Sequence, residues 1–203
     1  YEVNLAKNDR FNLLNNLPDY PKEDQLVETF KRGDVKAEFR HDDYASADAR
    51  VRYRGVSPSH WNAVKKSWHI NLPDEYPLDG RTDFRFFIPE DKGWIIGNLL
   101  EDRGKRLGLI TPEVTYARLR INTVDMGVYL LIEGWEESLL ERHGKPLGPI
   151  FSNKNLTTSN IDLFSADSFY FWENRFADQT QGNQNEALRY LLDLVENAPD
   201  DVF

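Results

Sequence analysis

Residues 49–72 read ARVRYRGVSPSHWNAVKKSWHINL, and their alternation predicts two antiparallel strands joined by a polar loop. Successive side chains of a strand point to opposite faces, so Val51 and Tyr53 would share one face and three arginines the other. The arginines are Arg50, Arg52 and Arg54. The second strand would place Lys65, Ser67, His69 and Asn71 on its polar face. Its other face would carry Lys66, Trp68, Ile70 and Leu72. We expect the two polar faces to form one cationic surface that suits an anion such as a nucleotide phosphate. The alternative is that these arginines are solvated and paired with nearby acids.

The composition is typical of a globular protein with a sizeable core. The chain has 203 residues, of which 40% are hydrophobic and 29% charged. Its net charge of −9, from 25 Lys and Arg against 34 Asp and Glu, disfavours nucleic acid and anionic membranes as partners. No apolar run approaches the roughly 18 residues that span a bilayer, and the first residues do not resemble a signal peptide, so we expect neither. Without cysteine there is no disulfide, thiol nucleophile or zinc–thiolate site.

The remaining pattern predicts an α+β fold with a mostly antiparallel sheet and packed helices. Alternation and turn residues predict strands at residues 1–5, 34–40, 49–54, 65–72, 84–88, 115–122, 126–135 and 168–176. The first would be an edge strand, and residues 122–125 would form a hairpin turn. Helical spacing of apolar residues predicts helices at residues 8–17, 94–107, 136–144 and 183–198. Residues 150–167 are expected to be irregular.

Two of these helices carry an apolar stripe. In the helix at 94–107 the stripe consists of Ile95, Ile96, Leu99, Leu100 and Leu107, and Gly108 would end the helix. Gly97 and Gly104 weaken this helix by about 1 kcal/mol each relative to alanine, which suggests close packing against the sheet. In the helix at 183–198 the stripe consists of Ala187, Leu188, Leu191, Leu192 and Val195.

Four segments, taken in order, resemble the N-terminal portion of the CotH-type (spore coat protein H) atypical protein kinase family. They are RYRGVSPSHWNAVKKSWHINL, FRFFIPEDKGWIIGNLLEDRGKRLG with the following TYARLRIN, MGVYLLIEGWEESLLERHG, and FYFWENRF. The resemblance implies an atypical kinase-like small lobe at residues 1–134 and the start of a large lobe at residues 135–203. It also implies that ATP is used with Mg or Mn to phosphorylate Ser or Thr of secreted or surface proteins.

The function expected from this resemblance is ATP binding within such a kinase. Its partners would be a nucleotide and a protein substrate, with no nucleic acid and no membrane span. Its location would be extracellular or at a cell or spore surface. The alternative is a catalytically inactive scaffold, or a glycan- or protein-binding module at the cell surface.

The resemblance also implies nucleotide-binding residues. They are Arg52, Arg54, Gly55, Ser57, Ser59, Lys65, Glu101 and Glu133. Lys65 would hold the nucleotide phosphates, the loop that begins at Arg54 would cover them, and Glu101 would orient Lys65, by analogy to ordinary kinases. The alternatives remain open: Lys65 could be a solvated strand lysine, and Glu101 a surface glutamate near Arg103 or Lys105. Glu133 would end the hairpin where a kinase hinge begins; its alternative is to cap the helix that starts near Glu136.

The chain departs from the family pattern in ways that affect activity. Val56 stands where the family has Asn, and the catalytic aspartates and the metal-binding segment are expected beyond Phe203. The catalytic residues are therefore unknown, and no metal ligand is assigned; Asp200 and Asp201 match neither motif. The four histidines lack metal-site spacing. Three tryptophans, Trp61, Trp68 and Trp94, could flank an adenine or belong to the core.

Overall fold

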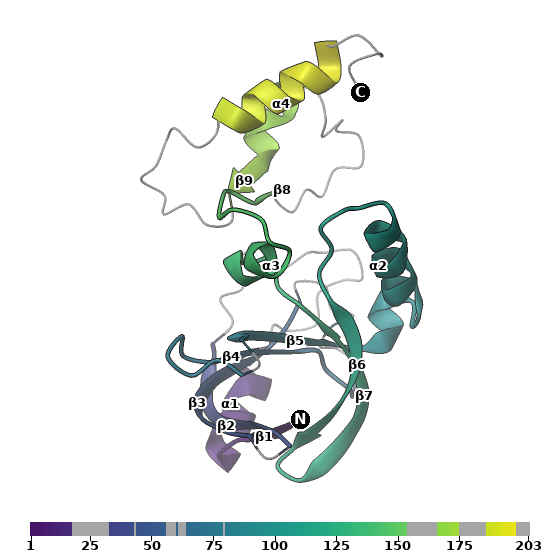
Figure 1. The fold of residues 1–203 in the computed structure, drawn as a ribbon. Helices are drawn as coiled ribbons and strands as arrows, with labels where there is room; N and C mark the ends of the chain where they lie inside the picture. The colour runs from purple at the N-terminus through teal and green to yellow at the C-terminus, as the bar shows by residue number, and fades with distance from the viewer. Residues whose placement is uncertain are drawn as a thin grey trace. The chain divides into compact units, whose positions relative to one another are not determined.

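The computed structural model describes a mixed α+β protein (Figure 1). It describes residues 1–17, 33–42, 44–55, 60, 64–78, 80–153, 166–174 and 186–197, without the side chains of 44–47, 153, 166, 167 and 171. The chain forms two compact units, Tyr1–Gly134 and Trp135–Phe203. The assignment of these units to the lobes of a kinase stays a prediction.

The first unit is built on a barrel rather than on an open antiparallel sheet. Its strands are β1 (Glu2–Asn4), β2 (Val35–His41), β3 (Tyr44–Tyr53), β4 (Trp68–Asn71), β5 (Asp83–Phe87), β6 (Val114–Ile121) and β7 (Val124–Ile132). They close in the order β1-β2-β3-β4-β5-β7-β6, and every neighbouring pair is antiparallel except β1 and β6 (Figure 1). The prediction that the first strand lies at an edge is wrong, because β1 pairs with β2 on one side and with β6 on the other.

Asn122 helps to close this barrel at β1. Its side-chain amide donates to the Leu5 carbonyl over 2.9 Å and accepts from the Leu5 N–H over 2.6 Å. Asn122 and Thr123 have left-handed φ values of 49° and 69°, as a two-residue type I′ hairpin turn requires. The predicted hairpin turn is therefore confirmed, with Ile121 paired to Val124 across it.

The alternation predicted for β3 and β4 is confirmed. Ala49, Val51 and Tyr53 are buried in the barrel core, and so are Trp68 and Ile70 of β4. The register places Tyr53 opposite Trp68 and Arg52 opposite His69, so the two polar faces are adjacent. Aromatic side chains fill much of the core, among them Phe39, Phe84, Phe86 and Tyr129.

Two helices and one 3-10 turn accompany the barrel. They are α1 (Lys7–Asn15), η2 (Pro89–Lys92) and α2 (Ile96–Arg106), which packs against β6. As predicted, α2 ends at Gly108, whose φ of 74° is left-handed. Gly104 packs closely on Thr111, which precedes β6, since an added Cβ would lie 2.5 Å from the Thr111 methyl group. At Gly97 an added Cβ would lie 3.8 Å from Val114 of β6, which is an ordinary contact with the sheet.

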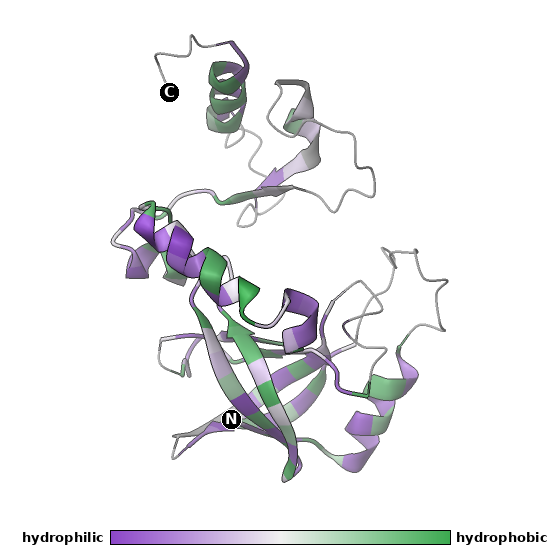
Figure 2. Ribbon diagram, turned by 90° about the vertical axis from the view of Figure 1, so that its right-hand side faces the viewer, coloured by the Kyte–Doolittle hydropathy of each residue, from purple (hydrophilic) through white to green (hydrophobic). Residues whose placement is uncertain are grey.

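The apolar stripe of α2 does not pack on the barrel. The buried residues of α2 are Glu101 and Gly104, whereas Ile96, Leu99 and Leu100 are more than half exposed. Figure 2 shows the alternation of polar and apolar residues along this helix. The helix therefore faces the sheet with its polar, glycine-containing side.

The second unit contains α3 (Glu137–Arg142), β8 (Phe151–Asn153), η3 (Ala166–Phe171), β9 (Trp172–Asn174) and α4 (Glu186–Asn197). α3 confirms the short helix predicted after Glu136. The strand predicted at 168–176 is wrong in its first half, since η3 is helical and β9 starts at Trp172. β9 pairs with β8, which lies in the region expected to be irregular. α4 confirms the last predicted helix and buries Leu188 and Leu192.

Candidate functional site

The loop that follows β3 is fixed at its base by backbone hydrogen bonds. The Arg54 N–H donates to the Ser67 carbonyl over 2.9 Å, and the Ser67 N–H donates to the His60 carbonyl over 2.7 Å. Gly55 has a φ of 95°, and an added Cβ would lie 1.9 Å from the His60 ring. Both the backbone conformation and the space therefore require glycine at position 55.

The predicted loop residues are only partly covered by the structure. Ser57, Ser59 and Trp61 lie outside the described residues. Their nucleotide contacts stay predictions.

Basic and aromatic side chains meet beside Gly55, at the end of β5. The Arg54 guanidinium carbon lies 3.9 Å from the centroid of the Phe87 ring, and the Lys92 ammonium lies 4.9 Å from it. His60 Nδ1 is 2.6 Å from a carboxylate oxygen of Asp91. Burial lowers the pKa of His60, and Asp91 acts in the opposite direction. Burial also lowers the pKa of Lys92, and the positive charge of Arg54 adds to that effect.

The sequence analysis missed Lys92, His60 and Phe87 as members of this cluster. The segment PEDKG, residues 89–93, follows a buried strand directly, which was a weak local signal. Its proximity to Arg54 depends on the pairing of β3, β4 and β5, and the local pattern does not contain that pairing.

Lys65 reaches the backbone of β7. Its ammonium donates to the Val128 carbonyl and lies 4.3 Å from the centroid of the Tyr129 ring. Burial lowers the pKa of Lys65, while Glu90 and Asp125 raise it. Of these acids, Glu90 belongs to η2, the same turn that carries Lys92 and Asp91.

Lys66 lies over another tyrosine of the barrel core. Its ammonium is 5.7 Å from the Tyr53 ring centroid, and it lines a pocket of about 90 Å³ together with Trp68 and Tyr53. The prediction preferred Lys65 to Lys66 because of strand alternation. β4 begins only at Trp68, so that argument does not extend to either lysine. The choice of Lys65 depends on the family resemblance.

Arg52 belongs to a buried hydrogen-bond network rather than to a free cationic surface. Its Nε and Nη2 lie 3.0 and 2.8 Å from Nδ1 of His69. A guanidinium can only donate, so Nδ1 accepts and the protonated Nε2 donates to Asp83. Arg85 pairs with the other oxygen of Asp83 at 2.5 Å. The predicted cationic surface is therefore a mixed network at this point. The alternative of a solvated arginine paired with an acid does not describe Arg52 either, because Arg52 is partly buried and bonds to His69.

Charge and burial act in opposite directions within the network. Burial lowers the pKa of His69, and Asp83 raises it. Burial raises the pKa of Asp83, but His69 and Arg85 outweigh that effect and hold the pKa of this carboxyl well below its usual range. At neutral pH, Asp83 is thus ionised and His69 neutral.

The structure does not bring Glu101 to Lys65. The Glu101 carboxylate is buried, binds the Lys105 ammonium and accepts from the Val114 N–H over 3.0 Å. The contact with Lys105 agrees with the open alternative, but Glu101 is buried and is not the surface glutamate of that alternative. In the part of the chain that the structure describes, Glu101 joins α2 to β6.

Glu133 lies directly after β7 and is buried. Its N–H donates to the Glu113 carbonyl and its carboxylate accepts from the Glu113 N–H, each over 3.0 Å. It therefore extends the β6–β7 pairing by one residue. Trp68 is a core residue at 3% exposure, whereas Trp94 is 56% exposed.

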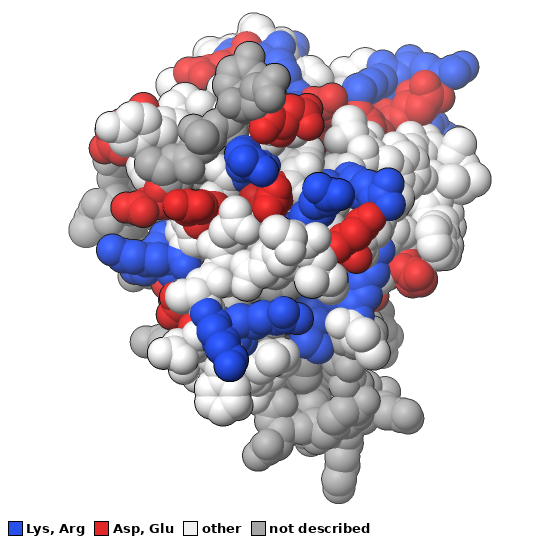
Figure 3. All heavy atoms as spheres, turned by 90° about the horizontal axis from the view of Figure 1, so that it is seen from below, with Lys and Arg blue, Asp and Glu red and all other residues white. Residues whose placement is uncertain are grey.

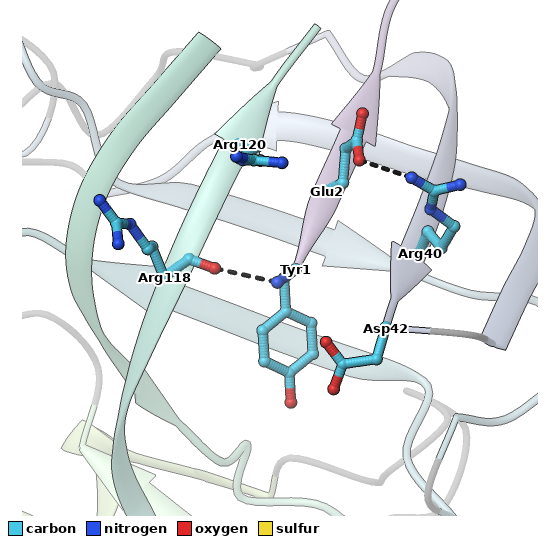
Figure 4. Close-up of a pocket in the computed structure, with 6 residues that line it drawn as sticks. All are labelled: Tyr1, Glu2, Arg40, Asp42, Arg118 and Arg120. Carbon is cyan, nitrogen blue, oxygen red and sulfur yellow. Dashed lines mark hydrogen bonds and ion pairs between the residues drawn. The ribbon is translucent and has the colours of Figure 1, made fainter. Parts of the chain in front are cut away.

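A cavity of about 310 Å³ lies elsewhere on the barrel, on the outer side of β1, β2 and β6 (Figure 4). It is lined by Tyr1, Glu2, Arg40, Asp42, Arg118 and Arg120. Arg40 pairs with Glu2 at 2.8 Å and Arg118 with Asp125 at 2.5 Å. Basic and acidic side chains are likewise interspersed on the face shown in Figure 3. None of the predicted nucleotide-binding residues lines this cavity.

The described residues contain no group of three or more His, Asp or Glu side chains placed to hold a metal ion. They also contain no helix that combines the length and the apolar character needed to cross a membrane.

The comparison with protein families indicates that the chain is a kinase-like protein. A family model described as CotH kinase protein matches residues 51–203 and so includes every predicted nucleotide-binding residue. The chain belongs to the CotH kinase protein family. No curated protein matches the chain.

Proposed function

We propose that the unit Tyr1–Gly134 binds ATP through its phosphates, as the nucleotide-binding part of a CotH-type protein kinase. The kinase would use Mg or Mn and phosphorylate Ser or Thr of secreted or surface proteins. Its location would be extracellular or at a cell or spore surface. Family membership supports the kinase class, and the geometry around Gly55 supports the position of the phosphates.

The observation that carries the proposal is the gathering of three cations around η2. Arg54 and Lys92 lie on the Phe87 ring, and Lys65 lies close enough to Glu90 of η2 for the two charges to interact. Burial lowers the pKa of both lysines, so each ammonium is partly deprived of water. A polyanion placed among such cations stabilises their charged forms, and they stabilise it in return.

The backbone beside these cations also suits a phosphate. Gly55 begins the loop in a conformation that side chains rarely adopt. The missing side chain at Gly55 makes room for His60, and successive N–H groups in such turns often bind anions. The metal would need few protein ligands, because Mg is often held by one or two carboxylates together with substrate phosphates.

Calorimetric titration with ATP and Mg tests the proposal. We expect Lys65→Ala and Arg54→Ala each to weaken binding about tenfold or more, because a hydrogen bond to a charged group contributes roughly 1.5–3 kcal/mol. Arg50→Ala is the matched control, since Arg50 lies on β3, which ends just before Arg54, and is paired with Asp34 at 3.7 Å. Equal affinity of all four proteins, or no ATP binding by the folded wild type, would contradict the proposal.

A further inference from the structure

The outward side of α2 is an apolar surface, which we call the α2 face. It consists of Ile96, Leu99, Leu100 and Leu107, which are 53%, 58%, 63% and 68% exposed, and it continues at the start of the helix through Trp94 and Ile95 at 56% and 60%. Scattered exposed apolar residues are common on proteins, but a contiguous set usually marks an interaction site.

The contacts on the other side of α2 hold the helix in this orientation. Val114 of β6 donates its N–H to Glu101 over 3.0 Å and accepts at its carbonyl from the Asn98 amide over 2.9 Å. Gly104 lies so close to Thr111 that a side chain would not fit there. Turning the leucines inward would break both hydrogen bonds and give up the close packing of Gly104 on Thr111. The exposure of the α2 face is thus fixed by specific contacts.

A cation lies within the α2 face. At 3.6 residues per turn, Arg103 lies on the same line as Leu100 and Leu107. Its basic neighbours on the helix have acidic partners: Lys105 pairs with Glu101, and Arg106 with Asp102 at 2.8 Å. Arg103 is exposed, and no acidic partner for it occurs among the residues that the structure describes.

We propose that the α2 face binds an amphipathic helix of another protein. The helix would present apolar side chains three and four residues apart and one carboxylate opposite Arg103. Helices pack in this way through apolar stripes, and a charge within or beside the stripe selects the partner. This inference does not depend on nucleotide binding.

Charge complementarity argues against a second copy of the chain as the occupant. A symmetric pair centred on the α2 face would bring two Arg103 side chains together, and like charges at an interface disfavour association. A carboxylate on the helix of another protein avoids this repulsion and can pair with Arg103.

A display library of helical 14-residue peptides tests the proposal against the immobilised chain. The library keeps leucine at positions 3, 6, 10 and 13 and varies the remaining positions, and binders to Leu100→Ser are removed first. We expect the selected peptides to share Asp or Glu at one position between the leucines. Selection of peptides without a shared acid, or no selection at all, would overturn the proposal.

Fluorescence anisotropy with one selected peptide then tests the contact with Arg103. We expect Leu99→Ser and Leu100→Ser to weaken peptide binding about tenfold. Leu147→Ser is the control, because Leu147 is a leucine of the second unit with 57% exposure, and it should leave binding unchanged. Arg103→Glu should abolish binding, and a peptide with lysine in place of its acid should restore it. Three outcomes would overturn the proposal. They are equal binding of the peptide to all variants, concentration-dependent dimers of the chain that Leu100→Ser abolishes, and binding of α2 to phosphatidylglycerol vesicles instead of peptide.

Discussion

Gly55 and His60 form the tightest approach at the base of the candidate loop. An alanine at position 55 would combine a left-handed φ of 95° with a Cβ 1.9 Å from the His60 ring. Gly80 has a comparable φ of 72°, yet an added Cβ there would have nothing within 4 Å. The two glycines therefore separate the effect of strain from the effect of space.

We predict that Gly55→Ala destabilises the first unit by about 2 kcal/mol more than Gly80→Ala, because overpacking adds to backbone strain. Chemical denaturation followed by tryptophan fluorescence gives both free energies of unfolding. The double variant Gly55→Ala with His60→Ala should recover part of the difference. Equal costs at the two glycines would show that the contact with His60 is unimportant.

His69 makes stability depend on pH through its network with Arg52, Asp83 and Arg85. Burial holds its pKa below the ordinary value of 6.5, so the unfolded chain binds a proton more readily than the folded one. Stability contributed by neutral His69 is therefore present above pH 6.5 and is lost as the pH falls through the folded pKa. Asp83, whose pKa is lowered, loses its contribution only in the acid range below its ordinary value of 3.8.

We predict that the free energy of unfolding of the first unit falls between pH 7 and pH 5. His69→Gln should remove part of this fall, and the rest belongs to His60, whose pKa burial also lowers. The substitution should itself cost about 1–3 kcal/mol at pH 7, since it leaves Arg52 and Asp83 with fewer partners. Denaturation curves across this pH range measure both effects, with His143→Gln as the control. An unchanged pH profile in His69→Gln would contradict the assigned network.

α2 shows what the sequence could and could not predict at the scale of an element. Its extent, its apolar stripe and its end at Gly108 follow from local spacing, and all three occur in the structure. The side of α2 that faces the sheet was not predicted, because it depends on Val114, which bonds to Asn98 and Glu101 across a tertiary contact. Helical periodicity identifies the apolar side of a helix, but it does not state which side faces the sheet.

We predict that Glu101→Ala destabilises the first unit by about 1–3 kcal/mol, because the buried Val114 N–H loses its acceptor. If Glu101 only joins α2 to β6, its effect on ATP affinity should add to that of Lys65→Ala. A double-mutant cycle by calorimetry measures this, and additivity within about 0.5 kcal/mol is expected for sites without contact. A larger coupling would show that Glu101 orients Lys65 when nucleotide is bound.

The strands of the barrel were predicted well because each is encoded by alternation within a few residues. Closure of the barrel was not predicted, since the parallel pairing of β1 with β6 joins Glu2 to Arg120, far apart in the chain.

The residues of the candidate site also differ in whether the local sequence predicts them. Arg54 and Gly55 were found from their own segment, whereas Lys92 and His60 join them only through the folded arrangement.

In the whole molecule, one unit, Tyr1–Gly134, supplies the cations of the proposed nucleotide site. This differs from a general affinity for anions, which the net charge of −9 disfavours. The binding should therefore be confined to the lysines beside η2 and should depend on the phosphates of the ligand.

Lysine acylation read by mass spectrometry, with and without saturating ATP and Mg, tests this claim most directly. We predict that ATP protects Lys65 and Lys92 from acylation, that adenosine does not, and that the exposed Lys36 of β2 reacts equally throughout. Protection of Lys65 and Lys92 by ATP would place the phosphates beside η2. Equal labelling of Lys65, Lys92 and Lys36 in saturating ATP would contradict the account.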